Sequence, residues 1–200
     1  MADRVPQGTG ARVLLGGGIG AGKSTVAALM GSADFRVVNA DAVGREVLAP
    51  GTEATTLVGE MWPTVLVDGS IDRRELARIV FSDAFELRRL EAVTHPEIVR
   101  RIHEIVEQCG QEDLVVETPL PGLLAQDDFV NVVVVADRDT RLERAVLRGN
   151  DAADTQRRMR AQPSDLEWRE WADHVIDNSG TTEATKTAVA DLVELVRRRG

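Results

Sequence analysis

Short apolar runs alternate along this chain with longer amphipathic stretches. A run of four to eight apolar residues bounded by polar positions is typical of a buried strand. One run is nearly continuous in β-branched residues, as in strands of a parallel sheet that is covered on both faces. We therefore predict strands at five places: 11–15, 36–39, 114–116, 129–136 and 174–176.

The stretches between these runs indicate helices. Asp72 and Glu75 have the spacing of a capping box, which predicts a helix start, and His95-Pro96 predicts a helix break. Strands that alternate with helices predict an α/β fold with a doubly wound parallel sheet. Four predicted helical stretches cover residues 24–30, 42–62, 139–170 and 182–198, and the second of them is broken at Pro50-Gly51. Another predicted helix begins at residue 72, and one more resumes after residue 96 and ends near residue 109.

Composition narrows the class of protein. The chain of 200 residues has 24 basic and 33 acidic residues, a formal net charge of −9, and a single cysteine. An acidic chain lacks the basic face with which proteins follow a nucleic-acid backbone, so we expect no nucleic-acid partner. No apolar run approaches the roughly 20 residues that cross a bilayer, and the first residues do not resemble a secretory signal. We expect a cytoplasmic protein without a membrane partner, and the sequence sets no oligomeric state.

Residues 17–24 read GGIGAGKS and match the phosphate-binding loop G-x-x-x-x-G-K-[ST]. Glycines let consecutive backbone N–H groups approach a polyphosphate, and the helix that follows presents its positive end to the same anion. Lys23 adds a full charge near the β- and γ-phosphates, and the Ser24 hydroxyl is a ligand for Mg²⁺. We predict a nucleotide site made by Gly17, Gly20, Ala21, Gly22, Lys23, Ser24 and Thr25.

Asp41 follows the second predicted strand, at the edge of the sheet where doubly wound folds bind their ligands. A carboxylate in this place orients or deprotonates an acceptor hydroxyl and approaches Mg²⁺. The alternative is that Asp41 caps the helix that follows it, since aspartate is a good capping residue. The spacing alone leaves both interpretations open.

Six arginines lie between residues 141 and 160, whereas the whole chain has two lysines, Lys23 and Lys186. Cations around a γ-phosphate stabilise the charge that spreads over its oxygens, and a mobile arginine-bearing segment supplies them on closure. The alternative is a solvated face paired with acidic neighbours, which the residues favour for any single arginine. The six are Arg141, Arg144, Arg148, Arg157, Arg158 and Arg160, and the acidic neighbours are Glu143, Asp151 and Asp154.

From about residue 12 to residue 198 the chain resembles the dephospho-CoA kinase family. The phosphate-binding loop is shared with many families, whereas the order of the remaining motifs is more specific. These are Ala40-Asp41 with Arg45-Glu46-Val47, Pro50-Gly51-Thr52, Asp68-Gly69-Ser70-Ile71-Asp72-Arg73 with Leu76 and Val80-Phe81, Leu90-Glu91 with His95-Pro96, the residues Arg144, Arg148, Arg158 and Gln162, and Ala172-Asp173 with Ile176-Asp177-Asn178-Ser179-Gly180.

The resemblance implies a phosphotransferase with an alcohol acceptor, in which ATP donates its γ-phosphate to the 3′-hydroxyl of dephospho-CoA. It implies a five-stranded parallel core, a helical insertion that binds the acceptor, and a lid. On this chain the core covers about 11–41, 109–144 and 171–198, the insertion about 42–108, and the lid about 145–170.

The resemblance also implies roles for particular residues. Asp41 becomes the general base and a neighbour of Mg²⁺, which Ser24 holds. Lys23 and Arg148 stabilise the transferring phosphoryl group. Arg158 closes over the ATP phosphates, and Asn178 lies near the adenine.

Four positions depart from the family pattern. Asn39 and Glu117 stand where aspartates are usual, and the extra CH₂ of Glu117 displaces any water-mediated contact with Mg²⁺. Pro121 removes a backbone donor, and Leu123 stands at a usual glutamate. These departures concern acceptor docking and rate more than ATP binding. They leave two alternatives, another P-loop kinase for a nucleoside or metabolite hydroxyl, and a nucleotide-binding regulatory protein without turnover.

Overall fold

The computed structural model describes residues 10–122, 124 and 128–199, so Leu123 and the first nine residues lie outside it. The chain divides into two compact units. Met1–Asn39 and Gln108–Gly200 contribute to the first unit, and Ala40–Glu107 forms the second. The predicted acceptor-binding insertion falls on the second unit. Among the described residues, no helix has the length and apolar content needed to cross a bilayer.

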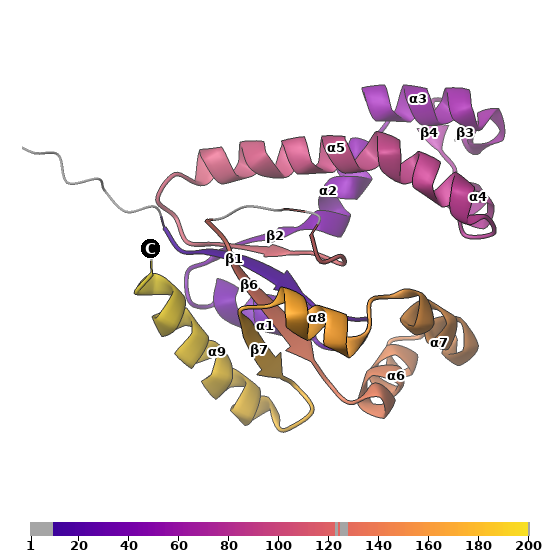
Figure 1. The fold of residues 1–200 in the computed structure, drawn as a ribbon. Coiled ribbons are helices and arrows are strands. Elements are labelled where there is room, and N and C mark those ends of the chain that lie inside the picture. The colour runs from indigo at the N-terminus through magenta and orange to yellow at the C-terminus, as the bar shows by residue number, and fades with distance from the viewer. Residues whose placement is uncertain (1–9, 123, 125–127, 200) are drawn as a thin grey trace, which may run out of the picture. The chain divides into compact units, whose positions relative to one another are not determined.

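A parallel sheet forms the centre of the first unit. Its strands are β1 (Arg12–Gly16), β2 (Arg36–Asn39), β5 (Leu114–Glu117), β6 (Val130–Val135) and β7 (His174–Asp177). They lie in the order β2-β5-β1-β6-β7, and every neighbouring pair is parallel (Figure 1). The predicted five-stranded α/β fold is therefore confirmed, and the carboxyl ends of all these strands meet at one edge.

The two faces of the sheet are covered by different helices. Side chains alternate between faces along a strand, so every second residue points the same way. One set packs with buried residues of α1 (Lys23–Gly31) and α9 (Thr182–Arg197), and it comprises Val13, Leu15, Val115, Val132, Val134 and Ile176. On the opposite face, Val133 and Val135 pack against Trp168.

The predicted helical stretch over 139–170 is three helices, α6 (Arg138–Leu147), α7 (Ala152–Ala161) and α8 (Asp165–Trp171). Gly149, with a φ of 87°, ends the first. Asp151 begins the second by accepting the N–H of Asp154, and Ser164 begins the third with a capping box. Each break therefore has a local cause in a turn or a cap.

The second unit contains α2 (Ala40–Val47), α3 (Glu53–Met61), the 3₁₀ turn η1 (Pro63–Val65), the strands β3 (Leu66–Val67) and β4 (Ser70–Ile71), α4 (Arg73–Val80) and α5 (Ala84–Cys109). The small hairpin was not predicted. Its two-residue turn has φ values of 49° at Asp68 and 76° at Gly69, as a turn matched to strand twist requires. The buried core of the second unit comprises Val58, Trp62, Val65, Ile71, Leu76 and Val80.

The helix start predicted at Asp72 is confirmed, because its carboxylate accepts the N–H groups of Arg74 and Glu75. The Glu75 carboxylate pairs with Arg78 one turn later, in place of the predicted reach back to the cap. Asp72 alone therefore satisfies two of the donors that a helix start leaves open.

The helix break predicted at His95-Pro96 is wrong. Helix α5 runs from Ala84 to Cys109 with Pro96 inside it. A proline in a helix interior costs about 3 kcal/mol, through a lost hydrogen bond and a clash with the preceding turn. Packing on both sides offsets this cost: Leu87, Leu90 and Val93 lie against the core of the second unit, and Ile98 contacts α2 at Gly44.

Replacing Pro96 by alanine restores the missing donor and removes the clash. We expect Pro96→Ala to raise the free energy of unfolding by about 1–3 kcal/mol, measured by urea denaturation. The control is Pro63→Ala, at the start of η1, where a proline interrupts no helical hydrogen bond. A lower unfolding free energy for Pro96→Ala would contradict this account of α5.

Candidate functional site

A glycine-rich turn connects β1 to α1 at the carboxyl edge of the sheet. Gly17, Gly20 and Gly22 have φ values of 139°, 76° and 102°, which side-chain-bearing residues rarely adopt. Gly22 directly precedes α1 and takes its N-cap position. The loop therefore has the backbone freedom that a ring of inward-facing N–H groups requires.

Asn178 holds the end of this loop from the other side. It is buried, its Nδ2 donates to the Ala21 carbonyl at 2.8 Å, and its Oδ1 accepts the Thr185 hydroxyl at 2.8 Å. A Cβ at Gly22 would collide with the Asn178 amide, so the glycine is also a steric requirement. The side chain of Asn178 thus fixes the loop, and its contact with adenine stays a prediction.

Lys23 and Ser24 stand at the start of α1. The Lys23 ammonium donates to the Gly17 carbonyl at 2.7 Å, across the loop. The Ser24 hydroxyl donates to Glu117 Oε1 at 3.2 Å, and Asn39 Nδ2 donates to Glu117 Oε2 at 2.9 Å. A hydroxyl and a carboxylate, both hard oxygen ligands, therefore meet beside the loop.

The neighbouring arginines serve different purposes. Arg141 is buried and donates to the Ile19 carbonyl, and Arg144 Nη2 donates to the Asn178 carbonyl at 2.9 Å. Arg148 is exposed and ends α6 as its C-cap. Of these three arginines from the predicted group of six, Arg141 and Arg144 already bind backbone groups around the loop.

A hollow of about 130 Å³ adjoins the loop, lined by Gly22, Thr25, Arg144, Arg148, Asn178, Thr182 and Thr185. Arg144 Nη1 is buried, and within the described part of the chain it has no hydrogen-bond partner. A buried donor without a partner is costly in a folded protein. Arg144, which lines the hollow, therefore keeps one unused guanidinium donor beside the loop.

Asp41 belongs to the second unit, in the first turn of α2. Because α2 already includes Ala40, the alternative of a helix cap at Asp41 is wrong. Its role as a base stays a prediction. Arg158 lies in the last turn of α7, exposed, and its closure over phosphates stays a prediction as well.

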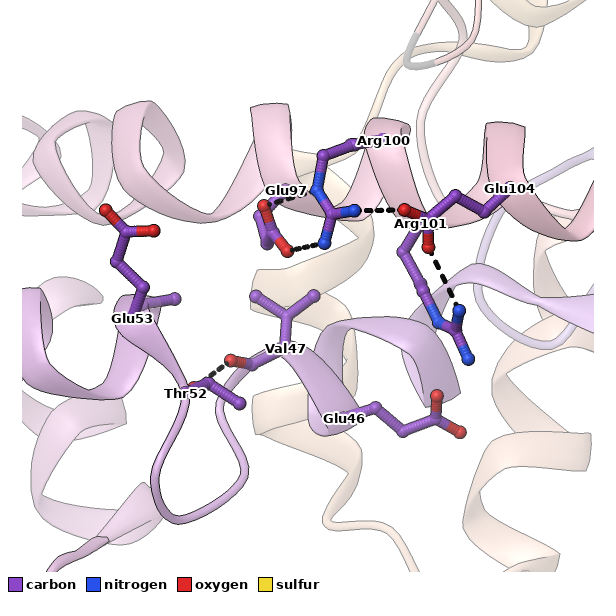
Figure 2. A pocket seen from close by; sticks show the side chains of 9 residues that line it. Glu46, Val47, Thr52, Glu53, Glu97, Arg100, Arg101 and Glu104 are labelled. Carbon is purple, nitrogen blue, oxygen red and sulfur yellow. Dashed lines mark hydrogen bonds and ion pairs between the residues drawn. The ribbon is translucent and has the colours of Figure 1, made fainter.

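The second unit has a larger cavity, of about 250 Å³, between α2, α3 and α5 (Figure 2). Arg100 pairs with Glu97 and Glu104, and Arg101 pairs with Glu104 at 3.0 Å. The Arg100 hydrogen bond lowers the pKa of Glu97 below its usual range, so this carboxylate is ionised at neutral pH. With Glu46 and Glu53 the lining holds four carboxylates against two guanidinium groups, which disfavours a phosphate in this cavity.

The sequence of this chain is similar to those of known proteins. A model of the dephospho-CoA kinase family matches residues 11–184. The chain belongs to the dephospho-CoA kinase family.

Individual relatives extend the match over most of the chain. Dephospho-CoA kinase from Thermobifida fusca is 39% identical over 194 residues, which are 94% of this chain and 97% of that protein. The dephospho-CoA kinase from Streptomyces avermitilis is 39% identical over 196 residues, covering 94% and 95%. A Thermus thermophilus crystal structure is 31% identical with a TM-score of 0.80, covering 94% of this chain and 98% of that chain.

The fold extends beyond these relatives. A shikimate kinase from Acinetobacter baumannii, 16% identical, covers 96% of this chain and 95% of its own with a TM-score of 0.55. Likeness at that identity concerns the fold alone.

Sequence reasoning missed two contacts at this site. The displacement of a water-mediated Mg²⁺ contact by Glu117 stays a prediction, but the contact of its carboxylate with the Ser24 hydroxyl was not foreseen. For Arg141, sequence reasoning left a cation for phosphate and a solvated face open and favoured the solvated face, whereas the side chain is buried and binds the Ile19 carbonyl and Asp165. The position of Glu117 at a strand's carboxyl end was the available signal; Arg141 had none, since its partners lie far away in sequence.

The capping box of α8 makes a pH-dependent prediction. Glu167 accepts both the hydroxyl and the N–H of Ser164 at 2.7 Å, and these bonds lower its pKa below the ordinary glutamate value. The stabilisation is present above the ordinary value and is lost as pH falls through the lowered pKa. We expect an NMR titration to give a lowered midpoint for Glu167, and Ser164→Ala to return it upward.

The control for this titration is Ser179→Ala. Ser179 lowers the pKa of Asp177 in the same manner, through its hydroxyl and its N–H. This control should raise the Asp177 midpoint and leave Glu167 unchanged. A Glu167 midpoint that ignores Ser164→Ala would rule out the capping box as its cause.

Proposed function

We propose that this protein transfers the γ-phosphoryl group of ATP to the 3′-hydroxyl of dephospho-CoA, which gives coenzyme A. The observation that carries the proposal is membership of the dephospho-CoA kinase family over residues 11–184, which include the complete phosphate-binding loop. Phosphoryl transfer needs positioning and charge stabilisation more than covalent chemistry. The residues of the loop and its surroundings supply both.

In this proposal the loop binds the ATP phosphates through the N–H groups of residues 20–25 and the N-terminus of α1. The Lys23 ammonium exchanges the Gly17 carbonyl for phosphate oxygens, which are stronger partners because they are charged. Arg148 and Arg158 add charge to the transferring group from α6 and α7. The free donor of Arg144 and the neighbouring Asn178 adjoin the adenine in the hollow beside the loop.

Residues of the chain also fit Mg²⁺, the metal that accompanies ATP in such reactions. The Ser24 hydroxyl and the Glu117 carboxylate lie 3.2 Å apart and are the oxygen donors that this ion prefers. Ser24 and Glu117 would hold it together with phosphate oxygens, and we keep Asp41 as a further candidate ligand. When bound, the ion neutralises charge that develops between the β- and γ-phosphates.

The acceptor is proposed to bind the second unit, at residues predicted for the insertion, with the segment of about 145–170 as the lid. Asp41 in α2 accepts the proton of the 3′-hydroxyl as the oxygen attacks phosphorus. The leaving group is ADP. Exclusion of water by the lid protects ATP from hydrolysis during this step.

One assay tests the substrate. The purified protein is mixed with ATP, with and without Mg²⁺, and with a panel of acceptors, and ADP release is followed. We expect release with dephospho-CoA and Mg²⁺. Release only with a nucleoside or another metabolite would replace the proposed acceptor, and ATP binding without release on any acceptor would indicate a regulatory nucleotide-binding protein.

Asp41 is tested by Asp41→Asn, which keeps the shape of the side chain and removes the base. We expect turnover to fall by about 10²–10⁴, while ATP affinity measured by calorimetry stays within about twofold. The matched control is Asp68→Asn in the same unit, in a hairpin turn whose positive φ asparagine tolerates. Full turnover by Asp41→Asn would remove this residue from the role of base.

A further inference from the structure

In the phosphate-binding loop, the backbone N–H and the backbone carbonyl of Ile19 both form hydrogen bonds with side chains. Its N–H donates to Gln162 Oε1 at 2.8 Å, and its carbonyl accepts from Arg141 Nε at 2.9 Å. The two side chains come from different segments, since Arg141 is on α6 and Gln162 is the C-cap of α7. A short flexible loop thereby gains two fixed contacts at one position.

The Arg141 side chain is held in a fixed position for its contact with Ile19. It is only 8% exposed, and its Nη1 pairs with Asp165 Oδ1 at 3.0 Å. A Cβ at Gly18 would collide with the guanidinium, and one at Gly20 would collide with the Arg141 carbonyl. A buried guanidinium requires such partners, because an unpaired buried charge is strongly destabilising.

Gln162, and the Asp165 partner of Arg141, both belong to the segment predicted as the lid. Asp165 is the first residue of α8, and Trp168 of the same helix lies where a Cβ at Gly16 would be. Gln162 donates its backbone N–H to the Arg158 carbonyl, one turn back along α7. The loop is thus tied by backbone and side-chain contacts to the helix that carries Arg158.

We propose that Gln162 and Arg141 are positioning residues, which hold the Ile19 backbone and so couple the nucleotide site to the α7–α8 segment. The inference rests on the proposed binding of ATP by the loop. Neither side chain touches a reacting atom. They fix the backbone on the outside of the loop, so that its inner N–H groups keep the orientation that phosphate needs.

The consequence is a specific division of kinetic effects. Without either of these hydrogen bonds the nucleotide-free loop adopts more conformations. The free energy needed to order the loop then reduces the free energy of nucleotide binding. ATP affinity should fall, whereas turnover at saturating ATP should change little. A general loss of folding would instead lower the active fraction without changing the affinity of the molecules that remain folded.

The test uses Gln162→Met, which keeps the length of the side chain and removes the acceptor, and Asp165→Asn, which removes the charge partner of Arg141. Asp165 is 56% exposed, and an asparagine in its place keeps an oxygen that can accept from Arg141, so this variant is compatible with folding even if Gln162→Met is not. The control is Asp154→Asn. Asp154 is 51% exposed and pairs with Arg157 at 3.1 Å, a similar ion pair that does not reach the loop.

We expect the Kd for ATP, measured by calorimetry without acceptor, to rise about five- to tenfold in Gln162→Met and about threefold in Asp165→Asn. Hydrogen exchange of the nucleotide-free protein should become faster in residues 17–22 in both variants. In steady-state assays the KM for ATP should rise while kcat changes less than about threefold. Asp165→Glu, which keeps the charge, should keep the affinity of the parent protein for ATP, and Asp154→Asn should leave this affinity unchanged as well.

An ATP affinity within twofold of the parent in both variants, with unchanged exchange of the loop, would overturn the proposal. An equal loss in Asp154→Asn would also overturn it, because it would show a general effect of charge in the segment. Binding and exchange are read without dephospho-CoA. They therefore still test the coupling if the chain phosphorylates a different acceptor, and that result would overturn the proposed function alone.

Discussion

When a phosphate-binding loop turns N–H groups inward, its carbonyl groups need donors from elsewhere in the protein. The structure supplies a side-chain donor for three of them: Lys23 for Gly17, Arg141 for Ile19 and Asn178 for Ala21. These donors come from α1, α6 and the end of β7. The surroundings of the loop are therefore set by the orientation of its backbone, and the glycines leave room for the donors to approach.

Asn39 and Glu117, two of the positions that depart from the family pattern, lie next to each other in the structure. They are opposite one another in the register of β2 and β5, at the carboxyl ends of the strands. Two carboxylates at this distance would repel, whereas the Asn39 amide donates to Glu117 and leaves its other oxygen facing Ser24. The longer side chain of Glu117 is thus held in place by the neutral residue opposite, and a carboxylate stays beside the Ser24 hydroxyl.

The sequence was a good guide wherever the cause of a structure is local. The five strands and the phosphate-binding loop followed from short patterns, and the helix start at Asp72 was found from its spacing to Glu75. The continuous α5 was not predictable, because packing on both sides of Pro96 outweighs its local preference. The same holds for Arg141, whose burial depends on Ile19 and Asp165, 122 and 24 residues away. Residues whose partners are distant in sequence carry no local signal, and much of the site is made of them.

The net charge of −9 is compatible with a site for ATP because the charges nearest to a bound anion weigh most in the potential that it meets. Arg100 and Arg157 pair with carboxylates one turn away on their own helices, and such exposed pairs contribute little to any distant field. Lys23 lies directly at the phosphate-binding loop, and Arg144 and Arg148 line the adjoining hollow. Charges within a Debye length of about 8 Å, among them these cations and the Glu117 carboxylate beside Ser24, weigh more in the potential at the loop than the sum over the chain. An acidic protein can therefore bind a highly charged anion where cations gather at the site.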